Sequence, residues 1–206
     1  MKKVFKNLFG LKKVNQKSSS AFFTKDIFES EKYMIGEYTY GKPTVLFDND
    51  AANLNIGKFC SIAKGVTIFL GGNHRLDWVT TYPFSVINSN FPKGREINGH
   101  PSTNGDVSIG NDVWIGRNST IMSGVSIGDG AVIATESLIS KNIGPYEVWG
   151  GNPARLIKKR FDDITIERLL GLKWWDWDLI EINNNMHLLC SGRINEFIEK
   201  NSDKKN

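Results

Sequence analysis

Aliphatic residues recur at every sixth position between residues 109 and 144. This first series consists of Ile109, Ile115, Ile121, Ile127, Ile133 and Ile139. A second series of mostly small or slender residues follows each of these by four positions: Val113, Ser119, Val125, Ala131, Ser137 and Ile143. A period of six fits neither an α-helix nor plain strand alternation, and it is typical of a parallel β-helix. We therefore expect one short strand and one turn per hexad, three hexads per triangular coil, and both series pointing inward.

The same period occurs earlier in the chain, at Ile35, Ile56, Ile62 and Ile68. Cys60 and Val66 take the second inward position there. A polar stretch with Gly and Pro interrupts the pattern between the first of these hexads and the next. We expect a single β-helix over residues 35–153. Before it, residues 1–34 read as a basic N-terminal segment that ends in a short helix over residues 21–34.

Residues 154–206 are expected to form an appendage after the β-helix. Its first part, residues 154–161, is basic and is predicted to be a turn. Asp162 or Asp163 is a candidate cap for a helix that runs through Leu172, and two further helices are predicted over residues 178–189 and 192–200. The tryptophans between the first two helices need an apolar surface, which the open end of the β-helix or a neighbouring subunit would provide.

Residues 69–106 break the hexad pattern and are rich in Gly, Asn, Pro and aromatic residues. A loop of this length inside a compact domain is uncommon unless it is functional. Insertions in repeat folds map to loops on one face, which is often the binding face. The insertion also contains His74 and His100, two of the three histidines of the chain.

Composition places the chain among ordinary globular proteins, with 206 residues, 40% hydrophobic residues and a net charge of +4. This mild basicity suits an anionic ligand and is too weak to indicate nucleic acid. Cys60 and Cys190 suggest neither a disulfide framework nor a metal site. No apolar run reaches membrane-spanning length and no signal-peptide core is present, so we expect a cytoplasmic protein. Residues 1–20 are either a solvated terminus or a basic amphipathic helix in weak contact with a membrane surface.

Several stretches together are similar to those of one family: IGKFCSIAKGVTI, GGNHRLDWVTTYPF, SIGNDVWIGRNSTIMSGVSIGDGAVIA, VWGGNPARLIKKRF and LLGLKWWDWDLIEI. The chain resembles the hexapeptide-repeat acyltransferases, and within them the xenobiotic acetyltransferases that include type B chloramphenicol and streptogramin acetyltransferases. The resemblance covers about residues 33–190. It implies an all-β fold, a left-handed parallel β-helix with a small helical appendage, assembled as a homotrimer. Acetyl-CoA is expected between adjacent subunits, with the acceptor beside it under the long loop.

The resemblance makes His74 the expected catalytic residue. Acetyl transfer to a hydroxyl needs a base, and imidazole side chains in general titrate near neutral pH. Taken on its own spacing, His74 is more simply a loop histidine with local hydrogen bonds, and no motif surrounds His100. Asp77 is a candidate to orient His74 or to contact the acceptor, and equally a turn residue. Tyr38 and Tyr82 are candidate acceptor contacts, with local packing as the alternative.

Coenzyme A carries phosphates, which basic side chains bind through charge-assisted hydrogen bonds. The basic run after the GGNPAR turn suits that role, although spacing alone favours a solvated surface. By resemblance, the candidate coenzyme contacts are Arg117, Thr135, Ser140, Lys141, Arg155 and Lys158. No metal is expected. Trp114 stands at an outward position, where it either lines the coenzyme cleft or packs against a neighbouring subunit.

The predicted function is acetyl transfer from acetyl-CoA to a hydroxyl of a small acceptor, with His74 as general base in a direct ternary complex. The acceptor is either an antibiotic such as chloramphenicol or a streptogramin, or a sugar of a surface polysaccharide. Gly144 and the run Asp77–Thr81 depart from the pattern of the antibiotic-modifying members, which leaves this choice open. The alternatives are transfer to a sugar amine, a non-catalytic trimeric binding scaffold, and metal-dependent hydrolysis, which needs three converging histidines.

Overall fold

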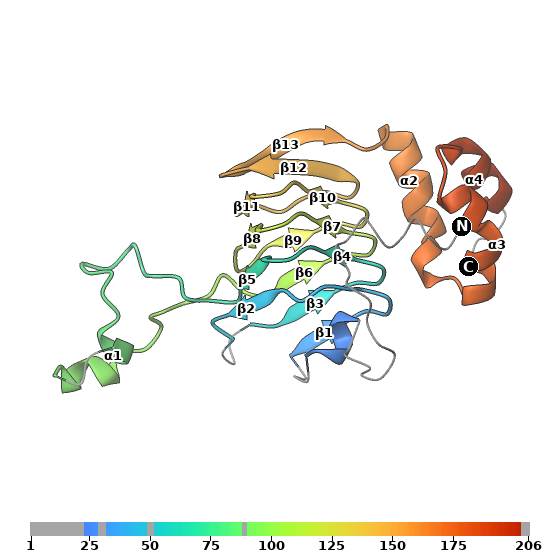
Figure 1. The fold of residues 1–206 in the computed structure, drawn as a ribbon. Coiled ribbons are helices and arrows are strands. Elements are labelled where there is room, and N and C mark those ends of the chain that lie inside the picture. Colours follow the sequence, from blue (N-terminus) through green and yellow to red (C-terminus); the bar gives the residue numbers. More distant parts are fainter. Residues whose placement is uncertain (1–22, 29–31, 49–51, 88–89, 203–206) are drawn as a thin grey trace.

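The computed structural model describes residues 23–28, 32–48, 52–87 and 90–202. Its body is a stack of coils with three flat faces, each a mainly parallel sheet (Figure 1). The β3 face contains β1 (Tyr33–Ile35), β3 (Leu54–Ile56), β6 (Val107–Ile109) and β9 (Ser126–Ile127). The β5 face contains β2 (Thr44–Leu46), β5 (Thr67–Phe69), β8 (Thr120–Ile121) and β11 (Leu138–Ile139). The β10 face contains β4 (Ser61–Ile62), β7 (Trp114–Ile115), β10 (Val132–Ile133), β12 (Glu147–Gly151) and β13 (Ala154–Lys159).

The strand register shows that one coil takes three hexads. Trp114 pairs with Val132 and Ile115 pairs with Ile133, in parallel. Thr120 pairs with Leu138 in the same way on the β5 face. Each aliphatic residue therefore lies directly under the residue three hexads later, as the period predicts.

Both repeat series form the core of the stack. The first series is at most 3% exposed and the second at most 4%. Two buried serines of the second series are satisfied, because the hydroxyls of Ser119 and Ser137 both donate to the Ala134 carbonyl, at 3.0 and 2.7 Å. The predicted inward positions are confirmed, including Cys60 and Val66. Trp114 is 56% exposed, which confirms its outward position.

A glycine directly after the aliphatic residue is required where two coils touch. A Cβ on Gly116 would lie 2.5 Å from the backbone nitrogen of Thr135 in the next coil. Since that neighbour is backbone, it cannot move aside as a flexible side chain would. The glycine thus sets the close spacing of the coils at this corner.

The helix predicted over residues 21–34 is wrong for the described part of that segment. Thr24–Asp26 form only a 3₁₀ turn, and β1 follows. Thr24 donates its N–H to the Thr39 carbonyl and its hydroxyl to the Gly41 carbonyl. These bonds to the first coil replace the hydrogen bonds of a helix. The interruption after Ile35 likewise contains β2, which pairs with β5. Residues 1–22, with the predicted membrane contact, lie outside the described residues.

The C-terminal region begins with a hairpin. The basic segment predicted as a turn is strand β13, antiparallel to β12. The three predicted helices are confirmed as α2 (Asp163–Leu172), α3 (Leu179–Leu189) and α4 (Ile194–Asn201). Asp162 caps α2 by accepting the Thr165 N–H at 2.9 Å, and Asp178 caps α3 in the same way from Glu181. None of the described helices is long and apolar enough to cross a membrane.

The helices pack beside the coils rather than over the open end of the stack (Figure 1). The Trp174 ring lies 4.9 Å from the Phe59 ring, which projects from a corner of the β-helix. The Tyr38 ring stacks on the other side of Phe59, also at 4.9 Å. Trp175 is buried. The tryptophans thus find their apolar surface on the side of the same chain.

The two cysteines are expected to differ sharply in reactivity. Cys60 is fully buried, and burial raises the pKa of its thiol to about 11, whereas Cys190 is exposed. Because the thiolate is the reactive form, iodoacetamide should modify Cys190 and spare Cys60 in the folded protein. Both should react in denaturant. Peptide mass analysis reads the result, and rapid native labelling of Cys60 would contradict this core packing.

Candidate functional site

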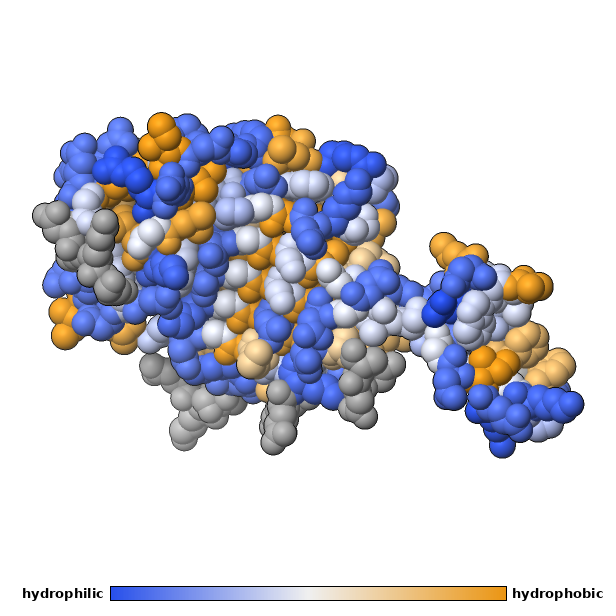
Figure 2. Space-filling view, turned by 180° about the vertical axis from the view of Figure 1, so that it is seen from behind, coloured by the Kyte–Doolittle hydropathy of each residue, from blue (hydrophilic) through white to orange (hydrophobic). Residues whose placement is uncertain are grey.

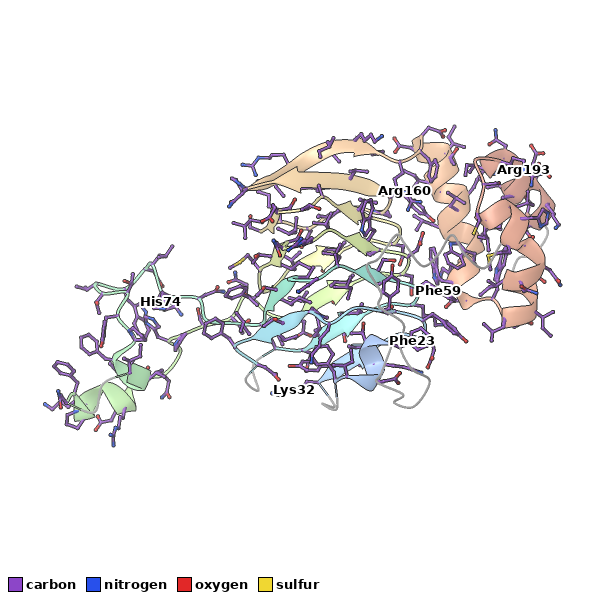
Figure 3. All side chains as sticks on the ribbon, viewed as in Figure 1. Phe23, Lys32, Phe59, His74, Arg160 and Arg193 are labelled. Atoms are coloured by element: carbon purple, nitrogen blue, oxygen red, sulfur yellow. The ribbon has the colours of Figure 1, made fainter. Side chains whose placement is uncertain are left out.

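The insertion leaves the stack between β5 and β6 and projects far from its body (Figures 1 and 3). It contains α1 (Phe84–Ile87) and a 3₁₀ turn over Pro92–Glu96. Its base is tied down at Asn73, whose N–H and carbonyl pair with the backbone of Ser102 at 3.0 and 2.8 Å. The Asn73 side chain also donates to the Ser123 hydroxyl at 2.8 Å, in the turn after β8. The residue before His74 therefore fixes the loop to the coils.

His74 is exposed, and its Nδ1 lies 2.6 Å from the Thr81 carbonyl oxygen. A carbonyl oxygen can only accept, so Nδ1 is the donor in this bond. With the proton on Nδ1, the neutral ring carries its lone pair on Nε2. A backbone group thus selects the tautomer in which Nε2 can accept a proton.

Asp77 does not orient His74. It forms a bidentate pair with Arg75, in which Nε and Nη2 donate to the two carboxylate oxygens at 2.8 and 2.5 Å. The hydrogen bonds from Arg75 lower the pKa of Asp77 to about 2, so it is ionised throughout the physiological range. The Thr81 backbone takes the place at the His74 ring that was one alternative for Asp77, and an acceptor contact of Asp77 stays a prediction.

His100, which has no motif around it in the sequence, lies next to His74. Its ring centroid is 5.1 Å from that of His74 and 5.3 Å from that of Trp78, both in edge contacts. It is 5% exposed, and neither ring nitrogen has a hydrogen-bond partner among the described residues. Sequence reasoning had no signal for this position, because the contact joins the two ends of the insertion.

The two tyrosines among the candidate acceptor contacts lie in different places. Tyr82 is in the insertion, and it lines a small cavity together with Trp78 and His100. Tyr38 packs between Phe23 and Phe59, on the side of the stack opposite the loop (Figure 3). Within one chain Tyr38 does not meet His74. An open pocket of about 420 Å³ does adjoin His74, and Phe47, Gly72, Pro83 and Pro101 line it.

The candidate coenzyme residues are exposed and fall into groups. Arg117 and Thr135 lie one above the other at the corner after β7 and β10, and Arg155 follows nearby on β13, opposite Gly150. Ser140 and Lys141 lie after β11, at the corner from which the loop departs. Lys158 lies at the far end of the hairpin, opposite Val148. The β5 face separates the first group from the loop.

A metal centre has no support in the described parts of the chain. They contain no group of three His, Cys, Asp or Glu side chains that could hold an ion. His74 and His100 form a pair, and no third ligand joins them there. Within one chain, the described residues therefore bring together two histidines, where metal-dependent hydrolases of this kind use three.

Comparison with known proteins gives this geometry its context. The family model "Bacterial transferase hexapeptide (six repeats)" matches residues 106–141. A probable macrolide acetyltransferase of Lysinibacillus sphaericus is 48% identical over 153 residues, which are 73% of this chain and 85% of the relative. The chain belongs to the hexapeptide-repeat acetyltransferases. A chloramphenicol acetyltransferase of Agrobacterium fabrum is 44% identical over 152 residues, covering 73% of this chain and 72% of that one.

Among solved structures, a galactoside acetyltransferase in complex with coenzyme A is 28% identical, with a TM-score of 0.45. The match covers 65% of this chain and 62% of that chain, which is less than two thirds of its length. The family and its xenobiotic branch are as the sequence motifs predict. This chain is therefore an enzyme, an acetyltransferase that uses acetyl-CoA as its acetyl donor. The non-catalytic scaffold alternative is thereby set aside.

Proposed function

We propose that the enzyme transfers the acetyl group to a hydroxyl of a small acceptor, with His74 as general base. One observation carries the proposal: the Nδ1 bond to the Thr81 carbonyl at 2.6 Å puts the ring in the tautomer with a basic Nε2. The ring is exposed beside an open pocket, so an acceptor can reach it. The fixed base of the loop at Asn73 keeps the imidazole in place during the reaction.

The reaction we propose is a direct transfer in a ternary complex. The acceptor oxygen attacks the thioester carbonyl carbon while its proton moves to His74 Nε2. The tetrahedral intermediate then expels the coenzyme A sulfur, which takes the proton from the imidazolium. The C–S bond breaks and a C–O ester bond forms, with no acetyl-enzyme. Neutral Nε2 at the start and at the end closes the proton balance.

For the acceptor we favour an antibiotic alcohol, because two relatives at 44–48% identity are named for macrolide and chloramphenicol acetylation. The second candidate is a sugar hydroxyl, which the departures at Gly144 and Asp77–Thr81 leave open. Transfer to a sugar amine is a further alternative. A neutral amine attacks the thioester carbonyl without losing a proton first, so His74 would then take the proton from the resulting ammonium after attack rather than during it.

We also propose a left-handed coil sense and a homotrimer with the active site between subunits. The loop projects from the stack, and several of its apolar side chains are exposed there (Figure 2). They include Leu76, Val79, Val86, Ile87 and Phe91, and their exposed fractions range from 48% to 109%. Such side chains suit burial against a neighbouring copy. A neighbour on that side would bring a second β5 or β10 face to His74 and complete a coenzyme cleft.

Arg155, beside Thr135 and Arg117, is our first choice for a coenzyme phosphate contact. Arg155→Gln should raise the KM for acetyl-CoA roughly two- to fivefold, as expected for an exposed ion pair, with little change in kcat. Lys200→Gln on α4 removes the same charge away from the corner and is the matched control. Initial rates at varied acetyl-CoA check this. Equal KM values for the two variants would remove Arg155 from the coenzyme site.

The function is tested by release of free coenzyme A thiol from acetyl-CoA in the presence of separate acceptors. The panel should contain chloramphenicol, a macrolide, a streptogramin, a simple sugar and an amino sugar. We expect release that depends on an antibiotic, with a product carrying one acetyl ester. Acceptor-independent release alone, or release with none of the panel, would contradict the proposal.

A further inference from the structure

His100 is a buried polar side chain whose ring nitrogens have no partner in the described parts of the chain. The residue is only 5% exposed, and neither Nδ1 nor Nε2 is hydrogen-bonded within the described residues. A buried imidazole with no partner loses its hydrogen bonds to water and gains none in return, which is unfavourable. Such a group calls for an occupant that supplies the missing bond.

A cavity lies where that occupant would bind. His100 lines a space of about 40 Å³ together with Trp78, Thr80, Tyr82, Phe84, Ser85 and Ile97. A cavity of roughly 10–15 Å³, measured in the same way, holds a single water, so this one has room for a group of a few heavy atoms. The position is close to the chemistry, because the His100 and His74 ring centroids are 5.1 Å apart.

Two of the other polar side chains around the cavity already make hydrogen bonds. The Ser85 hydroxyl donates to the His100 carbonyl at 2.7 Å. Thr80 Oγ1 accepts the Tyr82 N–H at 3.1 Å. The remaining walls are the rings of Trp78, Tyr82 and Phe84 and the side chain of Ile97. The cavity therefore has a largely apolar lining, and the His100 ring is a buried side chain in it whose nitrogens have no hydrogen-bond partner among the described residues.

We propose that this cavity is an acceptor subsite that holds a carbonyl or similar single hydrogen-bonding group on an otherwise apolar frame, with the His100 imidazole as its partner. The inference rests on the proposed function and narrows its substrate class. The subsite adjoins the reacting hydroxyl, because the His100 and His74 ring centroids are 5.1 Å apart. A polyol sugar fits poorly, because its other hydroxyls would meet ring carbon and lose hydrogen bonds to water.

The test uses three acceptors: β-hydroxypropiophenone, phenylpropanol, which lacks only the ketone oxygen, and methyl glucoside. The wild-type enzyme should show a kcat/KM for the hydroxyketone roughly tenfold or more above the other two, the size expected from one well-placed hydrogen bond. His100→Phe keeps a ring against His74 and Trp78 but has no nitrogen. His100→Phe should bring the ratio of the kcat/KM for the hydroxyketone to the kcat/KM for phenylpropanol close to one. The KM for acetyl-CoA should stay unchanged. His100→Gln should restore part of the ratio.

A merely structural role for His100 would lower the rate with every acceptor equally and leave the ratio intact, which would overturn the inference. A wild-type ratio near one would also overturn it, and would mean that the cavity holds water only. Methyl glucoside as the best acceptor would do the same. Each of these leaves the acetyltransferase proposal standing, whereas release with no acceptor of either panel removes both. If His100→Phe does not fold, the wild-type enzyme still decides, since only the hydroxyketone should shift the His100 ring nitrogen resonances.

Discussion

His74→Ala should lower kcat by about two to four orders of magnitude, the usual contribution of a general base, while the KM for acetyl-CoA stays nearly unchanged. The variant removes Nε2, the atom that we propose takes the acceptor proton, and also the Nδ1 bond to Thr81. Coupled thiol-release assays at saturating acetyl-CoA measure the loss. Binding of the coenzyme should survive, because its candidate contacts are on the coils and the hairpin.

Two control variants distinguish a role of His74 as general base from a role in holding the loop. His74→Asn can still offer an N–H to the Thr81 carbonyl but has no basic atom, so it should be as inactive as His74→Ala. His187→Ala, on the exposed side of α3, removes a histidine away from the site and should keep full activity. An active His74→Asn enzyme would show that the histidine only holds the loop.

Ile133→Ala should lower the free energy of unfolding by about 2–5 kcal/mol. Ile133 is fully buried and lies in β10, between Ile115 of the coil below and Trp149 of the coil above. Removing its side chain leaves a cavity between coils whose backbones are held at a fixed spacing and cannot close in. In a repeat fold each coil is stabilised by its two neighbours, so one cavity weakens two interfaces at once.

Ser126→Ala is the matched control, since Ser126 has an exposed side chain in strand β9. It should change stability by less than about 0.5 kcal/mol. Denaturant unfolding at one fixed protein concentration compares the variants, because assembly would add to apparent stability. Similar losses in the free energy of unfolding for the two variants would mean that burial of the Ile133 side chain does not stabilise the core.

The β-helix is readable from sequence because its contacts repeat. Each inward position is set by the same geometry, so the period alone placed the residues at 109–143 that prove buried. The helices after Asp162 were readable for a different reason, since their caps and apolar spacing are local. The helix predicted over residues 21–34 does not form in the described part of that segment, because tertiary bonds from Thr24 to the first coil outweigh local helix preference.

The site was only partly readable. The motif around His74 gives the candidate base, but the hydrogen-bond partner of its ring is the Thr81 backbone, which has no sequence signature. Asp77 stands close in the sequence and is taken by Arg75 instead. His100 enters the site through the folding of the insertion, 26 positions beyond His74, and only the structure shows their contact. A loop without a repeated sequence pattern has no period from which such contacts could be predicted.

The most direct test of direct acetyl transfer to a hydroxyl is a set of initial rates over a grid of acetyl-CoA and acceptor concentrations, with identification of the product. A ternary complex with His74 as base predicts double-reciprocal lines that intersect, an ester on the acceptor, and no acetyl group on the protein by intact mass. Parallel lines together with an acetylated enzyme would contradict this account, because they require a covalent acetyl-enzyme in place of direct transfer.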